Sequence, residues 1–174
     1  MTLTIRPAKT SDIPAITRIY AHAVEHGTAS FELSAPDEAE MARRMTELLE
    51  GGFPYLAAEV GGQLAGYAYA ALYRARPAYR LTIEDSVYIA PAMHRTGIGR
   101  ALLAALIEGA AAGGFRQMIA VIGDSPRQAA SIGLHEALGF RTVGILQVVG
   151  FKHGRWLDSV LMQRELGEGG KTNP

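Results

Sequence analysis

The order of β-type and helical segments is the feature that most constrains the fold. Two apolar runs, residues 55–60 and 63–72, are separated only by Gly61–Gly62, which is typical of a hairpin. Residues 81–89 form a third β-type run, and Pro91 follows it closely. Because hairpins join antiparallel strands, this part of the sequence predicts an antiparallel group of three strands.

A helix and a buried strand follow this group. Residues 97–112 are rich in alanine and leucine and precede Gly113–Gly114, which is typical of a helix end. Residues 117–122 are almost wholly apolar, as in a strand that is covered on both faces. A strand–helix–strand crossover joins parallel strands, so we predict an α/β fold with a mixed sheet and helices on its faces. The remaining predicted elements are strands at 3–6, 141–150 and 156–163, a helix from residue 13 to near Gly27, and helices at 36–50 and 127–138.

Length and charge limit the organisation and the partners of the chain. Its 174 residues fit one domain, which we expect to span residues 1–166. Residues 167–174 are polar and glycine-rich, and we expect this tail to be disordered. The 17 basic residues are balanced by 17 acidic ones. A nucleic-acid or membrane-surface binder needs a basic excess, so neither partner is expected.

The sequence contains no cysteine. This excludes disulfides, thiolate nucleophiles and cysteine-ligated metals, and it fits a cytoplasmic protein. We see no signal peptide in residues 1–12 and no apolar run of the ~20 residues that a membrane helix needs.

The segment from His94 to Arg100 carries the most specific motif. Gly97 and Gly99 lie one residue apart, where a strand gives way to a helix. Free N–H groups and the helix dipole at such a point form an anion site that suits a pyrophosphate, and Arg95 and Arg100 add positive charge. The alternative is an ordinary strand-to-helix turn that needs glycine for its geometry. The motif lacks the Gly-Lys-Ser/Thr of a phosphate-binding P-loop.

Glu84 and Asp85 interrupt the apolar run at 81–89. Neighbours on a strand point to opposite faces, so at most one of the two faces the core side. A carboxylate there has a raised pKa unless it is paired, which suits a general base. The alternative is a strand-end acid that pairs with an arginine of the segment 74–80.

Two further groups of residues are candidates for the site. His135 lies on the helix before Gly139, where a lone histidine is either functional or simply a surface or capping residue. No second histidine stands at metal-ligand spacing, so we expect no metal. Arg74 and Arg76 lie between two strands and either grip a carboxylate or form a solvated basic loop.

The combined motifs resemble the GCN5-related N-acetyltransferase (GNAT) superfamily. The strand that ends near Pro91, the loop Arg-Thr-Gly-Ile-Gly-Arg and the run Leu-His-Glu-Ala-Leu-Gly-Phe at 134–140 carry this resemblance. Thr-Ile-Glu at 82–84, Ser-Val-Tyr at 86–88 and residues 150–156 resemble its phosphinothricin and methionine sulfone/sulfoximine acetyltransferase branch. The resemblance covers residues 5–166.

This resemblance implies a GNAT fold of about seven mixed strands, in which the two central parallel strands splay apart. Acetyl-CoA would lie in the splay, with its pantetheine along Val87, Tyr88 and Ile89. Its pyrophosphate would bind the loop formed by Arg95, Thr96, Gly97, Ile98, Gly99 and Arg100. Two positions depart from the superfamily pattern. His94 replaces the usual Gln or Arg at the start of the loop, and Gln128 replaces an asparagine that contacts acetyl-CoA.

The resemblance also implies a chemistry without a covalent intermediate. Glu84 matches the proposed general base, and His135 occupies the place of the acid that protonates the leaving thiolate. Phe31, Asp85 and Ser86 fall on the substrate side, although Phe31 is equally suited to anchoring its loop. The expected enzyme is a cytoplasmic homodimer that acetylates the α-amine of a small amino-acid analogue. The alternatives are an acetyltransferase for a peptide N-terminus or a polyamine, and a non-catalytic acyl-CoA-binding module.

Overall fold

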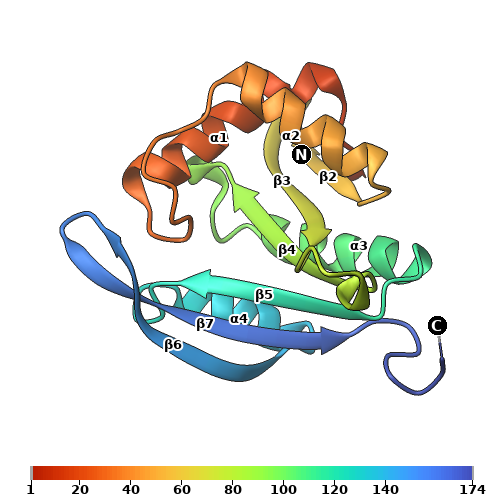
Figure 1. Cartoon of the computed structure of the whole chain (residues 1–174). Helices are drawn as coiled ribbons and strands as arrows, with labels where there is room; N and C mark the ends of the chain where they lie inside the picture. The colour runs from red at the N-terminus through yellow and green to blue at the C-terminus, as the bar shows by residue number, and fades with distance from the viewer. Residues whose placement is uncertain (1, 174) are drawn as a thin grey trace.

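The computed structural model describes residues 2–173, which fold around a seven-stranded sheet (Figure 1). The strands lie in the order β1-β2-β3-β4-β5-β7-β6. This arrangement confirms the predicted α/β fold with a mixed sheet. The strands are β1 (Leu3–Pro7), β2 (Tyr55–Val60), β3 (Gln63–Leu72), β4 (Thr82–Ile89), β5 (Gln117–Gly123), β6 (Arg141–Lys152) and β7 (Arg155–Glu165). The helices are α1 (Ile13–His26), α2 (Glu38–Glu50), α3 (Ile98–Ala112) and α4 (Ala129–Ala137).

Two glycines form the turn of the hairpin that joins β2 and β3. Gly61 and Gly62 have φ values of 59° and 80°, in the left-handed region that glycine adopts without steric cost. Strand β4 pairs antiparallel with β3, and the crossover through α3 then places β5 parallel to β4. Both observations confirm the predicted connections.

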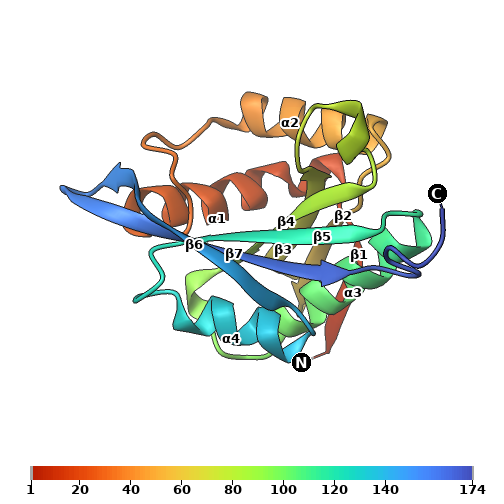
Figure 2. The ribbon, with the colours of Figure 1, turned by 60° about the horizontal axis from the view of Figure 1, so that its bottom comes forward.

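The helices form two layers around the sheet, with α1 and α2 on one face and α3 and α4 on the other (Figure 2). Side chains along β4 alternate between these layers. Ile83 and Ile89 belong to the core cluster built on α3, whereas Tyr88 belongs to the cluster beneath α1 and α2. The same alternation places Glu84 on the α1–α2 face and Asp85 on the α3–α4 face.

The parallel strands β4 and β5 separate part-way along their length. Their pairing ends at Glu84 and Ile119, yet β4 continues to Ile89 and β5 to Gly123. Beyond the last pair, β4 keeps only its bonds to β3, and β5 keeps only its bonds to β7. This separation confirms the predicted splay between the two central parallel strands.

The residues after β7 make defined contacts. Leu166 is buried, and the Gly169 N–H donates to its carbonyl at 2.9 Å. The Arg116 guanidinium also donates to Thr172 Oγ1 at 3.1 Å. Composition led us to expect disorder for residues 167–174, and that expectation stays a prediction. Pro174 lies outside the described residues.

Within residues 2–173, none of the helices combines the length and the apolar character needed to cross a bilayer.

Candidate active site

The loop before α3 leaves backbone N–H groups without partners. Arg95 and Gly97 have left-handed φ values of 62° and 87°, and Gly97 is the N-cap of the helix. No side chain caps this end, and the Ala101 N–H makes the first helical bond, to the Gly97 carbonyl at 3.1 Å. The N–H groups of residues 98–100 therefore find no acceptor among residues 2–173. With the helix dipole, they form a site for an anion such as a diphosphate.

Side chains around this loop divide into two groups. Arg95 and Arg100 are exposed and form no ion pair within the described part of the chain, so their charges are available to a ligand. Thr96 Oγ1 donates to the Met93 carbonyl at 2.6 Å and fastens the loop instead. The Ile98 side chain is buried in the core, so this residue offers a ligand only its N–H.

The separated part of β4 offers a strand edge. Residues 87–89 pair with β3 on one side and have no partner from β5 on the other. The side chains of Val87 and Ile89 pack toward α3, whereas the Tyr88 ring stacks on Tyr67. Unpaired backbone groups along an edge are suited to bind an extended chain that carries amides, as pantetheine does.

The opposite wall of the splay is organised by Asp124, directly after β5. Its carbonyl accepts the N–H of Gln128 at 3.1 Å and so helps to start α4. Its buried carboxylate accepts Thr28 Oγ1 at 2.7 Å and the Arg155 guanidinium at 3.0 Å. The bond from Arg155 holds the pKa of this carboxyl below its usual value. Sequence analysis did not anticipate this cluster, whose members are far apart in the chain.

Glu84 occupies the last position of β4 that is paired with β5, on the α1–α2 face. Burial raises its pKa above the ordinary value of 4.5, and the negative charge of Asp85 raises it further. Arg74 opposes these effects. A half-buried carboxylate with a raised pKa, at the point where the strands separate, has the properties of a general base.

Asp85 and His135 meet on the opposite face. His135 Nε2 lies 3.0 Å from Asp85 Oδ2, and both side chains are buried. His135 Nδ1 lies 2.7 Å from the Ser131 carbonyl, and Phe140 meets the imidazole ring edge-to-face. We expected Asp85 among the substrate contacts, but strand alternation turns it toward α4 instead. His135 is therefore a buried partner of Asp85, and not a surface or capping residue.

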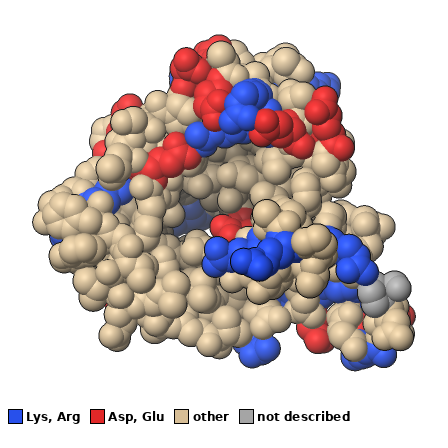
Figure 3. All heavy atoms as spheres, viewed as in Figure 1, with Lys and Arg blue, Asp and Glu red and all other residues tan. Residues whose placement is uncertain are grey.

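Arg74 and Arg76 lie on the exposed loop between β3 and β4. The Arg74 guanidinium lies 5.0 Å from the centroid of the Tyr73 ring, and its charge reaches Glu84. Neither arginine forms an ion pair with any residue from 2 to 173, so both guanidinium groups are available to an anionic ligand. Figure 3 shows a hollow in this face of the molecule, with acidic atoms inside it and basic side chains along its lower edge.

Phe31 lies on the loop between α1 and α2 and packs over two glycines. A Cβ at Gly123 would lie 2.5 Å from the Phe31 ring, and one at Gly150 would overlap it as well. The buried Lys152 Nζ donates to the Ser30 carbonyl at 2.7 Å and fixes the same loop. Phe31 is 38% exposed, so it is both a loop anchor and a surface that a ligand can contact.

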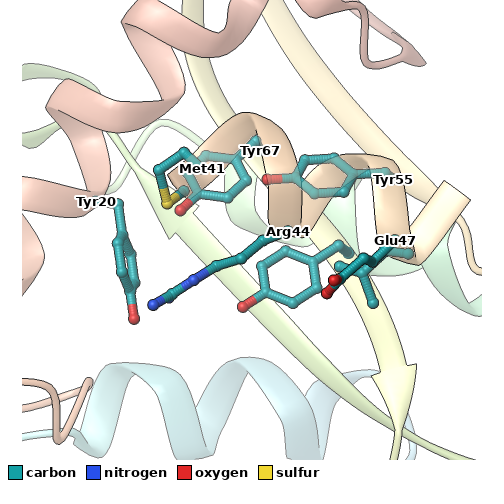
Figure 4. Close-up of a pocket in the computed structure, with 8 residues that line it drawn as sticks. Tyr20, Met41, Arg44, Glu47, Tyr55 and Tyr67 are labelled. Atoms are coloured by element: carbon teal, nitrogen blue, oxygen red, sulfur yellow. The ribbon is translucent and has the colours of Figure 1, made fainter. Parts of the chain in front are cut away.

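A cavity of about 240 Å³ lies between α1, α2 and the sheet (Figure 4). It was not anticipated, although the alternation of Tyr67 and Tyr69 along β3 was a signal that phenol rings share one face. The Tyr67 hydroxyl is buried and has no hydrogen-bond partner within residues 2–173. The cavity is lined by Tyr20, Met41, Arg44, Glu47, Leu48, Tyr55, Tyr67 and Tyr69.

Two contacts join this cavity to the rest of the site. Glu32 accepts the Tyr20 hydroxyl at 2.9 Å and the Arg44 guanidinium at 2.6 Å, which ties the Phe31 loop to the cavity wall. Tyr69 is the cross-strand partner of Ser86. Ser86 shares the face of Glu84, so the cavity adjoins the candidate base. No group of three or more metal-ligating side chains occurs within the described part of the chain.

The sheet with its splay, the uncapped start of α3 and the half-buried carboxylate define an acyl-CoA-dependent N-acyltransferase. Residues 5–161 match the acetyltransferase (GNAT) domain family, so the chain belongs to this family. It is an acetyltransferase that uses acetyl-CoA as its co-substrate, and the free N–H groups of α3 and the open edge of β4 fit that molecule.

Three relatives show how close this relationship is. The phosphinothricin N-acetyltransferase of Alcaligenes faecalis is 55% identical over 98% of this chain and 86% of its own length. The L-methionine sulfoximine/L-methionine sulfone acetyltransferase of Salmonella typhimurium is 40% identical over 95% of this chain and 96% of its own. A crystal structure of a phosphinothricin acetyltransferase from Sinorhizobium meliloti with acetyl-CoA superposes with a TM-score of 0.96. It is 49% identical and covers all of this chain and 94% of the other.

Proposed function

We propose that the enzyme transfers acetyl from acetyl-CoA to the α-amine of a small amino-acid analogue of the phosphinothricin, methionine sulfoximine or methionine sulfone type. The observation that carries this proposal is the position of Glu84. It is the last paired residue before the splay, its pKa is raised, and Arg74 lies within electrostatic reach. The names of the relatives support the substrate class.

The proposed mechanism needs a base, an acid and a site for the oxyanion. Glu84 accepts a proton from the attacking amine, directly or through a water molecule. Backbone N–H groups near Tyr88 stabilise the negative charge that develops on the carbonyl oxygen. His135 donates a proton to the sulfur that leaves. Acetyl-CoA supplies the activated thioester, and a neutral amine attacks it without an enzyme nucleophile, so the absence of cysteine is no obstacle.

Separate groups would hold the two substrates. Residues 87–89 and the loop at 95–100 would bind acetyl-CoA, together with Gln128 at the start of α4. On the α1–α2 face, Arg74 or Arg76 would bind the carboxylate of the amino acid, and Phe31 and Ser86 would contact its remainder. The adjoining cavity provides space for a side chain that carries an oxygen-bearing head.

We also propose a cytoplasmic homodimer. Strand β6 is an edge of the sheet, and its hairpin with β7 projects from the body of the molecule (Figure 1). Phe151 and Trp156 on this hairpin are 57% and 62% exposed, and their rings lie 5.3 Å apart. An exposed apolar edge strand is suited to bind a second copy of the chain. The further exposed apolar residues of β6 are Val143, Ile145, Leu146, Val148 and Val149.

An acetyl-CoA turnover screen tests the proposal. The purified protein is offered phosphinothricin, methionine sulfoximine, methionine sulfone, ordinary amino acids, polyamines and peptides, and free thiol is measured. We expect the highest kcat/KM for the three analogues. Preference for a polyamine or a peptide would overturn the substrate class, and binding of acetyl-CoA without any turnover would identify a non-catalytic module.

A further inference from the structure

The hydrogen bonds of His135 determine how many protons its ring carries. The Ser131 carbonyl lies 2.7 Å from Nδ1 and can only accept a hydrogen bond, so Nδ1 carries a proton. Asp85 Oδ2 lies 3.0 Å from Nε2. An ionised carboxylate also only accepts, so a second proton lies between Nε2 and Oδ2. Wherever that proton sits along the bond, the pair holds one proton more than a neutral histidine beside a carboxylate.

The surroundings of the pair retain this proton. Asp85 and His135 have only 2% and 5% of their side chains exposed. Loss of the shared proton would leave a net negative charge in an apolar setting, which is costly. From the segment after α4, the ring meets Phe140 edge-to-face, and that side chain carries no charge. The Arg164 guanidinium lies beside Gly139 in the same segment. Burial alone lowers the pKa of His135, but Asp85 and Ser131 together raise it above its ordinary value.

The position of the pair connects it to the reaction. Asp85 is the first residue of β4 after the last pair with β5, so its side chain stands at the head of the splay. Its second oxygen, Oδ1, is buried and has no partner within residues 2–173. The pair thus lies where a thioester would be cleaved, and one acceptor atom remains unused there.

We propose that Asp85 is a positioning residue that fixes the His135 ring and keeps it protonated, so that the pair stores the proton which the departing sulfur takes up. In the step itself, the amine nitrogen forms a bond to the acetyl carbon, and the carbon–sulfur bond breaks with its electron pair on sulfur. The nitrogen gives one proton to Glu84, and the sulfur receives one from His135 Nε2. Solvent then reprotonates the pair and takes the proton from Glu84.

The test follows the proton directly. Nitrogen-15 NMR titration of the five histidines reports the His135 ring whether or not the enzyme turns over. In the wild type we expect both ring nitrogens to be protonated at neutral pH. In Asp85→Asn we expect the His135 pKa to fall by about 1–3 pH units. The basic limb of the kcat profile should move to lower pH by a similar amount, because the acid loses its proton sooner.

A matched control and the contrary outcomes complete the experiment. Glu136→Gln removes one negative charge from an exposed neighbour on α4 and should change neither readout. The inference is overturned if Nε2 of wild-type His135 neither carries a proton nor shares one with Asp85 at neutral pH, even if Asp85→Asn fails to fold. A shifted NMR titration with an unmoved kcat profile overturns it as well. The proposal rests on the proposed function, but a protein that acetylates no amine fails that function in the screen and leaves the NMR result readable.

Discussion

Glu84 of β4 and Ile119 of β5 are the last two residues that the parallel strands pair, and the strands diverge beyond them. This relationship places a titratable carboxylate at the point where a sheet opens. Past it, the backbone groups of β4 that face β5 are unpaired, because the pairing of these two strands stops there. The same point therefore offers an open strand edge beside the carboxylate that we propose as the base.

The first prediction concerns the effect of removing the Glu84 carboxylate on the reaction rate. Glu84→Gln should lower kcat/KM by about 10²–10⁴-fold through loss of the base. In the wild type, kcat/KM should fall as pH drops through the raised pKa of Glu84, so the acidic limb should lie above pH 4.5, and the variant should lack it. Near-wild-type rates with an unchanged profile would exclude Glu84 as the base.

The same substitution should raise stability. The folded-state pKa of Glu84 lies above its unfolded value, so its contribution is most favourable below pH 4.5 and is lost as pH rises through the folded pKa. At neutral pH, Glu84→Gln should therefore be more stable than the wild type and unfold at a higher Tm. Calorimetric scans at pH 7.5 and pH 4 should show this gain shrinking at the lower pH.

The second prediction is that the two exposed arginines, Arg74 and Arg76, affect the binding of the amino acid but not that of acetyl-CoA. Losing a charge-assisted hydrogen bond costs about 1.5–3 kcal/mol. Arg74→Ala or Arg76→Ala should therefore raise the amino-acid KM by roughly 10- to 150-fold and leave the acetyl-CoA KM unchanged. Arg18→Ala, an exposed change on α1, is the control. If neither variant alters the amino-acid KM, the loop is only a solvated face.

The third prediction concerns the start of α3. A Cβ at Gly99 would make only ordinary contacts, 3.5 Å from Leu134, so Gly99→Val should fold. The branched methyl groups of valine would lie beside the free N–H groups that we propose bind the diphosphate, and they would block its approach. Acetyl-CoA affinity should therefore fall at least about tenfold, or 1.4 kcal/mol. Gly109→Ala on the same helix, where a Cβ would meet only Pro54 at 3.9 Å, should bind normally. Equal calorimetric affinities for both variants would argue against this binding site.

The fourth prediction tests the Phe31 loop. Gly150→Ala would drive a Cβ into the Phe31 ring, which would have to swing outward. Misplacing a substrate contact in this way should lower kcat/KM for the amino acid, by up to about 10²-fold. Gly144→Ala on the same strand meets nothing within 4 Å and should behave as wild type. Indistinguishable kinetics for the two variants would make Phe31 a loop anchor alone.

The fifth prediction concerns assembly. Trp156→Glu would place a charge in the exposed apolar face of the β6–β7 hairpin, so the sedimentation coefficient should fall from that of a dimer to that of a monomer. Leu49→Glu, which changes an exposed leucine on α2, should leave it unchanged. A wild-type protein that sediments as a monomer would remove the dimer from the proposal.

Sequence patterns predicted the features of this site that depend on near neighbours. Paired glycines before a helix, alternation along a strand and a crossover each follow from local geometry, so the mixed sheet and the glycine turn before α3 were predictable from the residues. The splay was expected only from the family resemblance. The bond between Asp85 and His135 joins residues 50 positions apart, and that between Thr28 and Asp124 joins residues 96 apart. Such pairs depend on how the layers stack. Likewise, composition could not reveal that Arg116 contacts the tail.

Asp124 has a consequence for attempts to redesign this enzyme. Its carboxylate binds Thr28 on the loop that carries Phe31, while its carbonyl helps to start α4. A loop transplanted from a relative to change substrate preference must therefore bring a hydroxyl at position 28. It must also place its aromatic ring over positions 123 and 150, which have to remain glycine because a Cβ there would clash with the Phe31 ring. The loop can be exchanged only together with these distant positions. Libraries that vary the loop residues alone would mostly sample sequences in which the loop cannot pack against the sheet.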